Sequence, residues 1–456
     1  MDAFASIAEL GKALRAKKVS SVELAHFYLD RLNTKGREYG AVAELTESLA
    51  MKQAKAADER FASGSPIGPL DGIPFGVKDL CATNGIPTRW GSPGHSDQVF
   101  RYDGTMVERL QNAGGVLVAK LAMIELAGGG NYDIAAASAT GAGLCAWDKT
   151  KWAGGSSSGS GAATALGCVP YSLGSETAGS IVCPSAFNGL TGFRPSYGRV
   201  SRHGAMALCW TLDRVGPIAR SVDDAALALA AIAGQDPLDP TTVAEKMSLR
   251  SRGAKPKIGM LKEDFKGNKA DVCAKAYAET IVVLQKAGYE FVDVEYPDMP
   301  YGVAIGIIVD AEGASAHENF IRGERFQTMA DIHQVAGLAA ALETKAVDYL
   351  WAMRLKQQAL KANAVWQKCD AIISPTFYHG APSAQGSLND QFALYGGDNG
   401  PSNLLGWPAI SFMNGFEGVL PLGMTVMAPC LREDICYRIA KDYQRETDWH
   451  KKHPSG

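Results

Sequence analysis

The first part of the chain carries apolar residues at helical spacing. Residues 20–33 place apolar side chains every three or four positions, which is the pattern of a surface helix packed on a core. Ser20 and Glu23 lie three positions apart and predict a capping box at the start of this helix. A second helix, rich in alanine, is predicted from Leu45 to Phe61 and ends before the turn at residues 64–72.

Farther along, short apolar runs alternate with helical stretches. Strands are predicted at residues 73–77, 116–120, 258–261, 291–294, 371–374 and 409–413. Helices are predicted at residues 105–111, 223–233, 272–287 and 342–367. Because strands that alternate with helices tend to form a sheet covered by those helices, the predicted fold class is α/β, with a large mixed, mostly parallel sheet and helices on both faces.

One stretch, residues 235–257, reads as a surface connection because it contains Pro237, Pro240 and a run of charges. We interpret it as a long loop within one fold, since chemistry-bearing sequence precedes it and core-like sequence follows it. The chain shows no internal repeat with a period of 20–50 residues. A single domain over residues 1–456 is therefore expected.

The composition of 46% hydrophobic and 20% charged residues supplies a substantial core and is unlike that of a disordered chain. The formal net charge of −3, with acids and bases interleaved, argues against nucleic acid as a partner. Nine cysteines without C-x-x-C spacing argue against a disulfide framework and a zinc site, which favours a reducing, cytoplasmic localisation. The acid at Asp2 is unlike a signal peptide, and no apolar run approaches the roughly 20 residues of a membrane span, so no membrane partner is expected.

Residues 154–201 are rich in glycine and serine, but apolar positions interrupt them regularly, unlike a flexible linker. Glycine lets a backbone approach a ligand closely, and successive free N–H groups can bind an anion. No G-x-x-x-x-G-K-[ST] string is present, which excludes a Walker phosphate loop at the level of the motif. The Gly141-Ala142-Gly143 string is a weak match to a dinucleotide fingerprint, because no clean strand precedes it.

Residues 155–159, Gly-Ser-Ser-Ser-Gly, also fit the G-x-S-x-G nucleophile elbow of α/β-hydrolases, with Ser157 as the nucleophile of an esterase. That mechanism needs a downstream histidine, and the candidates by position are His203, His317, His333, His379, His450 and His453. His379 is the best placed of them, since it follows the predicted strand at 371–374, but no acid partner is evident in the sequence. The esterase alternative therefore stays open.

Longer strings carry a more specific likeness. The chain reads GGSSSGS at 154–160, GSETAGSI at 174–181, PSAFNGLTGFRPSYGRVS at 184–201 and GIPFGVKD at 72–79. These strings resemble the signature block and the lysine segment of the amidase signature family. Shorter likenesses extend the resemblance over most of the chain, at residues 21–24, 370–376, 403–409 and 420–423. The weakest stretch is residues 236–360.

The resemblance implies a catalytic triad of Lys78, Ser156 and Ser180, with Ser156 held by a cis peptide bond. It implies an oxyanion hole made by the backbone N–H groups of Thr177, Ala178, Gly179 and Ser180, and no metal or organic cofactor. The chemistry is sound on its own terms, because a serine hydroxyl needs a neighbouring base and a desolvated lysine can be that base. Lys78 follows the apolar run 73–77, where desolvation is expected.

Three positions depart from the family pattern. Glu176, Ala178 and Val182 stand where the family usually has Asp, Gly and Arg. Ala178 fits only if that position does not need a positive φ. The loss of an arginine at Val182 leaves Glu176 without its expected partner.

The implied function is that of a single amidase signature domain that hydrolyses amide-type C–N bonds in amides, anilides and carbamates (urethanes), acting on a small substrate and water as a monomer or homodimer. The alternative within the family is the glutaminase subunit of a tRNA-dependent amidotransferase. The departures from the signature block favour the stand-alone enzyme. Candidate substrate-binding residues are large side chains in variable loops, namely Met123, Tyr132, Trp152, Trp210, Phe377, Tyr378 and Trp407.

Overall fold

One sheet of eleven strands organises the part of the chain that the computed structural model describes, which is residues 1–250, 253–265, 271–395 and 400–455. The strand order is β1-β3-β2-β6-β8-β7-β12-β13-β11-β9-β10. The strands are β1 Val42–Leu45, β2 Pro74–Lys78, β3 Val116–Leu121, β6 Tyr171–Glu176, β7 Thr191–Arg194, β8 Arg214–Ala219, β9 Ile258–Leu261, β10 Phe291–Val294, β11 Ala371–Pro375, β12 Ala409–Glu417 and β13 Leu420–Met427. A separate two-stranded sheet contains β4 Leu144–Cys145 and β5 Asp148–Trp152. The six predicted strands are all present.

The large sheet is mixed, as predicted. Parallel pairing is confined to two groups, β3-β2-β6 and β11-β9-β10. The other neighbouring pairs in the described sheet are antiparallel. One reason is a hairpin between β12 and β13, where Gly418 adopts a φ of 61° and short connections allow only antiparallel neighbours. Strands from before and after residues 235–257 belong to this one sheet.

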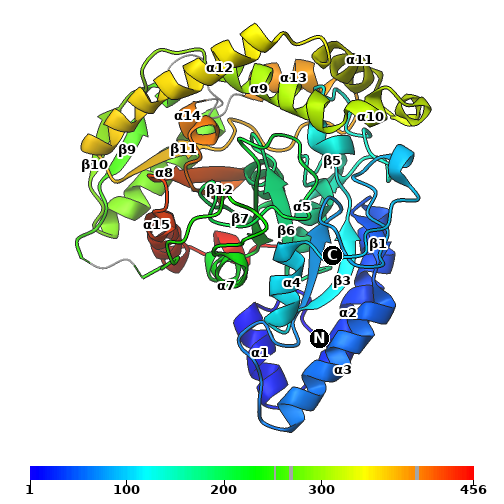
Figure 1. Ribbon diagram of the computed structural model, residues 1–456. Helices are drawn as coiled ribbons and strands as arrows, with labels where there is room; N and C mark the ends of the chain where they lie inside the picture. The colour runs from blue at the N-terminus through cyan, green and yellow to red at the C-terminus, as the bar shows by residue number, and fades with distance from the viewer. Residues whose placement is uncertain (251–252, 266–270, 396–399, 456) are drawn as a thin grey trace.

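Helices cover the sheet. They are α1 Ile7–Arg15, α2 Ser21–Arg31, α3 Glu47–Ala62, α4 Thr105–Asn112, α5 Ser158–Ala165, α6 Val182–Asn188, α7 Val222–Ile232, α8 Asp271–Lys286, α9 Tyr301–Ala316, α10 Glu318–Ile321, α11 Ile332–Ala341, α12 Ala346–Ala359, α13 Leu388–Tyr395, α14 Pro401–Leu404 and α15 Glu433–Glu446. Short 3₁₀ or π turns occur at Leu32–Gly36, Pro93–His95, Glu125–Gly128, Lys262–Phe265, Glu324–Thr328, Leu360–Gln367 and Trp449–Lys451. In Figure 1, α9 to α12 form an arc along one edge of the molecule, opposite α1 and α3.

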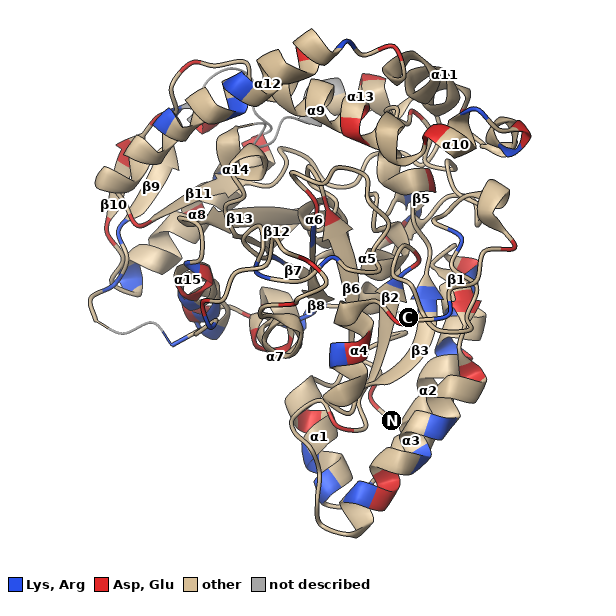
Figure 2. Ribbon diagram, in the orientation of Figure 1, with Lys and Arg blue, Asp and Glu red and all other residues tan. Residues whose placement is uncertain are grey.

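Alternate residues of β3 show how both faces of the sheet are buried. Leu117 packs into the core cluster that contains α1 and α7, whereas Val116 and Val118 pack into a second cluster with α2, α3 and α5. This alternation is the period of two expected for a strand, here with apolar residues on both sides. Figure 2 shows acidic and basic residues together along α2 and α3. Among them, the exposed residues include Glu23, Asp30, Lys52 and Glu59.

The predicted capping box is confirmed at α2. The backbone N–H of Ser20 donates to the Glu23 carboxylate over 2.7 Å, and the N–H of Glu23 donates to Ser20 Oγ over 3.1 Å. The prediction of one helix over residues 342–367 is wrong. The segment begins α12 only at Ala346, after an extended Lys345, and tightens to a 3₁₀ turn from Leu360, where Ala362 and Val365 are buried.

Candidate active site

Three side chains that are far apart in the sequence meet in one hydrogen-bonded chain. Lys78 is the last residue of β2, Ser156 lies in the turn before α5, and Ser180 lies between β6 and α6. Lys78 Nζ donates to Ser156 Oγ over 2.8 Å, and Ser156 Oγ donates to Ser180 Oγ over 3.0 Å. The structure thus brings together the three residues that the family resemblance suggests as a triad.

Lys78 is fully buried, with an exposed fraction of 0%. Burial lowers the pKa of its amine to about 7, because desolvation penalises the ammonium form, and Cys81, Asp213 and Glu176 oppose this shift only in part. Nζ also donates to Ser175 Oγ over 3.0 Å. A lysine with this pKa has a substantial neutral fraction near pH 7 and can accept a proton from a hydroxyl.

The peptide bond between Gly155 and Ser156 is cis. The next residue, Ser157, is fully buried and its hydroxyl donates to the carbonyl of Ser175 over 3.2 Å. His379 does have an acid partner, Glu417, at 3.1 Å, which the sequence did not reveal. However, no hydrogen bond between Ser157 and a histidine occurs among the described residues, so the geometry gives no support to a nucleophile elbow at Ser157.

Glu176 is partnered by Arg194 of β7. Arg194 Nη1 lies 2.7 Å from Glu176 Oε1, and the backbone N–H groups of Ile181 and Val182 donate to Oε2 over 2.8 and 3.0 Å. Burial raises the pKa of Glu176, but Arg194 and Arg214 outweigh it and hold that pKa below its ordinary value. An arginine from a different strand thus takes the place of the one expected at position 182.

The turn between β6 and α6 offers backbone N–H groups beside Ser180. Within the described ranges, no acceptor is hydrogen-bonded to the N–H groups of Ala178, Gly179 or Ser180. Gly179 has a φ of 106°, whereas Ala178 is absent from the residues with positive φ, so alanine is not strained there. Thr177, at the start of the turn, is anchored by a 2.6 Å hydrogen bond from its hydroxyl to Asp213. Free N–H groups next to a nucleophile are what an oxyanion hole requires.

A cavity of about 440 Å³ opens at Ser180, and we call it the Ser180 cavity. Ser180 is partly exposed, whereas Lys78 and Ser156 are buried, so only the end of the hydrogen-bonded chain faces this space. Its walls are mainly apolar and aromatic, with Tyr132, Leu208, Val309, Phe377, Leu388 and Phe392, together with Asn131 and Asn389. Among the described residues, no Lys, Arg, Asp or Glu side chain lines it.

The structure places only some of the predicted substrate-binding residues at this cavity. Tyr132 and Phe377 line it. Met123 and Trp407 do not, because both are buried in the core: Met123 closely follows β3, and Trp407 packs on Trp366. Large apolar side chains next to strands fill cores more often than they line pockets.

Three further aromatic candidates also lie outside the cavity lining. Trp152 is buried behind it, with its ring 5.9 Å from that of Tyr132. Tyr378 places its hydroxyl 3.5 Å from a carboxylate oxygen of Asp264. Trp210 is 47% exposed and lines a separate cavity of about 320 Å³, to which Ser175, Thr177 and Arg202 also contribute.

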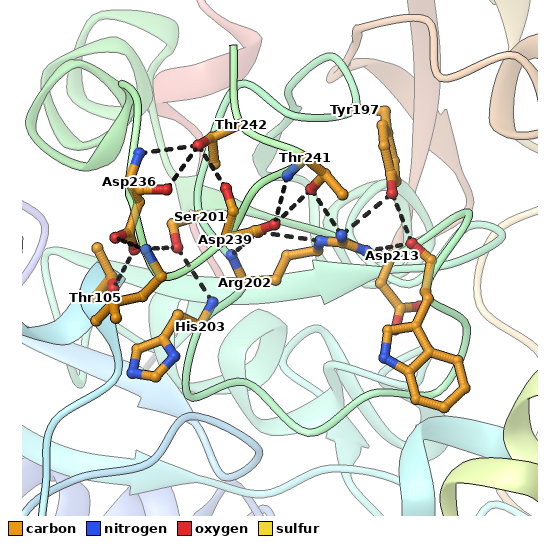
Figure 3. A network of polar contacts seen from close by, with 12 residues as sticks. Thr105, Tyr197, Ser201, Arg202, His203, Asp213, Asp236, Asp239, Thr241 and Thr242 are labelled. Carbon is orange, nitrogen blue, oxygen red and sulfur yellow. Dashed lines mark hydrogen bonds and ion pairs between the residues drawn. The ribbon is translucent and has the colours of Figure 1, made fainter. Parts of the chain in front are cut away.

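The wall of that separate cavity includes the beginning of the segment predicted as a surface connection. Figure 3 shows Asp236 accepting hydrogen bonds from Thr105 and Ser201, and Asp239 pairing with Arg202. Residues 236–242 are therefore tied to the body of the protein, whereas residues 251–252 of the segment lie outside the described residues.

Sequence reasoning missed several contributors. Ser175 accepts a hydrogen bond from Lys78 and lies inside a signature string. Serine is so common in these strings that the sequence does not distinguish Ser175 from its neighbours. Arg194 lies in the same block, and its role was hidden because its partner Glu176 is 18 positions away. Val309 and Phe392 come from the part of the chain with the weakest motifs or from a helix far downstream, so no sequence signal pointed to them.

In the part of the chain that the structure describes, no three His, Cys, Asp or Glu side chains gather where they could hold a metal ion. The described helices include none that is both long and apolar enough to cross a bilayer. None of the nine cysteines, all of which lie among the described residues, forms a disulfide bond, and Cys430 is the one that is exposed.

Known proteins are similar to this chain over nearly all of its length. Residues 23–436 match the family model described as Amidase. The chain is 34% identical to one of the subunits of the glutamyl-tRNA(Gln) amidotransferase of Synechococcus elongatus, over 99% of this chain and 100% of that protein. Among solved structures, the peptide amidase of Stenotrophomonas maltophilia superposes with a TM-score of 0.84 at 26% identity over 97% of both chains. A structure of a vestigial complex described as revealing the origins of an s-triazine catabolic enzyme superposes with a TM-score of 0.87 at 29% identity, over 97% of this chain and 98% of that one.

Proposed function

Since the chain belongs to the amidase family, with which it shares residues 23–436, we propose that it hydrolyses amide-type C–N bonds with Ser180 as nucleophile, Ser156 as proton bridge and Lys78 as base. The observation that carries this proposal is the hydrogen-bonded chain from Lys78 through Ser156 to Ser180, which is buried at the lysine and open to a cavity at Ser180. Substrates are small amides, anilides and carbamates.

The first half of the reaction transfers the acyl group to the enzyme. Neutral Lys78 accepts the proton of Ser156 while Ser156 accepts that of Ser180, and Ser180 Oγ bonds to the carbonyl carbon. The N–H groups of Ala178, Gly179 and Ser180, at the turn that Thr177 begins, stabilise the oxyanion. When the C–N bond breaks, the proton returns from Lys78 through Ser156 to the leaving nitrogen. A neutral amine departs, and Ser180 carries an ester.

Water completes the cycle by the same route. It gives a proton to Ser156 and Lys78 as its oxygen bonds to the ester carbonyl, and the proton then returns to Ser180 as the acid leaves. A carbamate follows the same steps. Its acyl-enzyme is a carbonate ester of Ser180, which water converts to an alcohol and carbon dioxide.

The lining of the Ser180 cavity favours neutral, partly aromatic substrates. Tyr132, Phe377 and Phe392 offer ring faces and edges to an aryl group. A charged substrate would lose its hydration there without gaining an opposite charge from the described lining. Anilides and N-aryl carbamates therefore fit better than amino acids do.

The glutaminase component of an amidotransferase is the second candidate, favoured by the 34% identity to the amidotransferase protein of Synechococcus elongatus. A glutaminase has to hold the ammonium and carboxylate groups of free glutamine. The neutral lining of the Ser180 cavity is the observation that ranks this candidate behind the stand-alone amidase.

The purified chain alone tests the choice. We expect it to release 4-nitroaniline from 4-nitroacetanilide and from ethyl N-(4-nitrophenyl)carbamate, with no added protein, RNA or metal, and to release little ammonia from L-glutamine. Ser180→Ala should abolish all of these activities. Ammonia release from glutamine at a higher kcat/KM than either aryl substrate, or activity that requires a partner protein, would favour the second candidate.

A further inference from the structure

A second cavity adjoins the Ser180 cavity, and we call it the Arg194 cavity. Its volume is about 280 Å³, and its lining includes Val182, Arg194, Thr376, Asn403 and Thr425. Ala178, Gly179 and Phe377 line both cavities. The two spaces therefore meet at the turn that offers free N–H groups beside Ser180.

Helix α9 forms a wall common to both cavities. Gly302, Ile305 and Gly306 line the Arg194 cavity, and Val309, less than one turn further along, lines the Ser180 cavity. Residues three and four apart lie on the same side of a helix, so one face of α9 runs past both spaces.

The Arg194 cavity is open on this side because α9 presents the glycines Gly302 and Gly306, which have no side chains. A Cβ added at Gly302 or Gly306 would meet no heavy atom of the described residues within 4 Å. Gly306 lies inside the helix, where glycine is less favourable than alanine. Neither glycine has a positive φ that would require it. Glycine at these two positions therefore leaves open space beside the helix, and a larger side chain would fill that space.

The chemistry of this cavity is cationic. Arg194 is only 2% exposed, and its Nε–H has no hydrogen-bond partner among the described residues. Arg194 and Arg214 flank one carboxylate, Glu176, and both donate to the side-chain oxygen of Asn403. Two buried guanidinium groups around one carboxylate favour a further negative charge or acceptor oxygen nearby, and they disfavour an ammonium group.

The acyl end of a substrate is the part that can reach this cavity. In the proposed reaction the leaving nitrogen must stay beside Ser156, which returns the proton to it. Gly155, the neighbour of Ser156, lines the Ser180 cavity but not the Arg194 cavity. With the leaving group on the side of Gly155, the acyl chain extends past Gly179.

We propose, resting on the proposed function above, that the Arg194 cavity is an acyl-side subsite that accepts acyl chains ending in a hydrogen-bond acceptor, best a carboxylate, and rejects chains ending in an ammonium group. This preference would separate a dicarboxylic monoamide, which carries only the negative charge, from glutamine, which carries both.

Three 4-nitroanilides of nearly equal acyl length test the subsite: succinyl, butyryl and β-alanyl. The wild type should hydrolyse the succinyl substrate with a kcat/KM at least roughly 10-fold above that of the butyryl substrate, as for a gained charge-assisted hydrogen bond, and the β-alanyl substrate slowest. Gly306→Leu, which places a side chain in the cavity and leaves residue Arg194 itself unchanged, should remove the succinyl preference. Its hydrolysis of 4-nitroacetanilide, whose acetyl group lacks the terminal group that the subsite would bind, should stay near the wild-type rate.

Val303→Leu is the matched control, because Val303 lies on the same helix, is exposed and lines neither cavity. It should keep the succinyl preference. A wild type that prefers the butyryl chain, or a succinyl preference that survives in Gly306→Leu, would overturn the subsite while leaving the amidase function intact. Failure of the wild type on all four anilides would instead count against the proposed function on which the subsite rests.

Discussion

Arg194 Nη1 lies 2.7 Å from Glu176 Oε1, and the two side chains are 2% and 0% exposed. The pair joins the last residue of β7 to the last residue of β6, directly before the turn that leads to Ser180. Glu176 Oε2 simultaneously caps the first N–H groups of α6. The carboxylate therefore fixes both ends of the turn that carries the candidate nucleophile.

Breaking this pair should cost much of the stability of the fold. Arg194→Met leaves Glu176 buried without its guanidinium partner, and the free energy of unfolding should fall by about 3–5 kcal/mol, as for other buried pairs that lose one member. Urea denaturation of the two proteins measures the difference. The double variant Glu176→Gln with Arg194→Met removes both charges and should recover part of the loss. Unchanged stability in Arg194→Met would mean that the two backbone N–H groups and the remaining guanidinium of Arg214 are enough to stabilise the carboxylate.

The two candidate nucleophiles should behave differently toward a serine-directed fluorophosphonate. Ser180 is partly exposed at the cavity, whereas Ser157 is fully buried and hydrogen-bonded to Ser175. Ser180→Ala should lose both turnover and covalent labelling, and Ser157→Ala should retain most of both. Intact-protein mass spectrometry reports the label. Loss of labelling in Ser157→Ala together with full labelling of Ser180→Ala would restore the α/β-hydrolase alternative.

Burial of Lys78 should also be visible in the pH dependence of stability. The folded protein holds the pKa of Lys78 at about 7, whereas an exposed lysine has a pKa of about 10.4. Between these values the unfolded chain binds more protons than the folded one, so this group makes the free energy of unfolding rise with pH, by up to about 1.4 kcal/mol per pH unit.

Lys78→Met removes that contribution. The free energy of unfolding should therefore rise less steeply with pH from about 7 to 10 in the variant than in the wild type, and the variant should gain most relative to the wild type at the lower end of that range. Other groups titrate in both proteins, so the difference between the two curves isolates Lys78. Parallel curves would show that the lysine is not desolvated in solution.

Much of the fold and the centre of the site could be predicted from the sequence because they depend on local patterns. Patterns in neighbouring residues predict the buried strand that ends at Lys78 and the capping box at Ser20. The signature strings give the spacing between Ser156 and Ser180. What could not be predicted depends on contacts between distant segments. Arg194 of β7 partners Glu176 of β6, and β8 lies between these two strands in the sheet. Val309 and Phe392 reach the Ser180 cavity from helices that carry no motif.

The wrong expectations have the same origin. Met123 and Trp407 are large apolar residues beside strands, and only the packed structure shows that their side chains fill the core. The helix expected over 342–367 is interrupted at Lys345 and tightened from Leu360, although its apolar spacing continues. Tertiary packing overrides a periodic pattern in such segments.

A role of Lys78 as the base should be visible in the pH dependence of the rate. If Lys78 is the base, it must be neutral to accept the proton that Ser180 passes through Ser156. With a pKa of about 7, kcat/KM for 4-nitroacetanilide should be low in acid, rise with pH through about 7 and level off above it. Lys78→Ala should remove this limb and lower the rate at least about 10²-fold, the lower end for losing a positioned base. Lys78→Arg should fail nearly as badly, because guanidinium stays protonated at every working pH. Stopped assays of the wild type, Lys78→Ala and Lys78→Arg from pH 5 to 9 measure kcat/KM for this comparison. If Lys78→Arg kept near wild-type activity and kcat/KM still rose with pH through about 7, Lys78 would be a structural residue. The rise with pH would then belong to another titrating group.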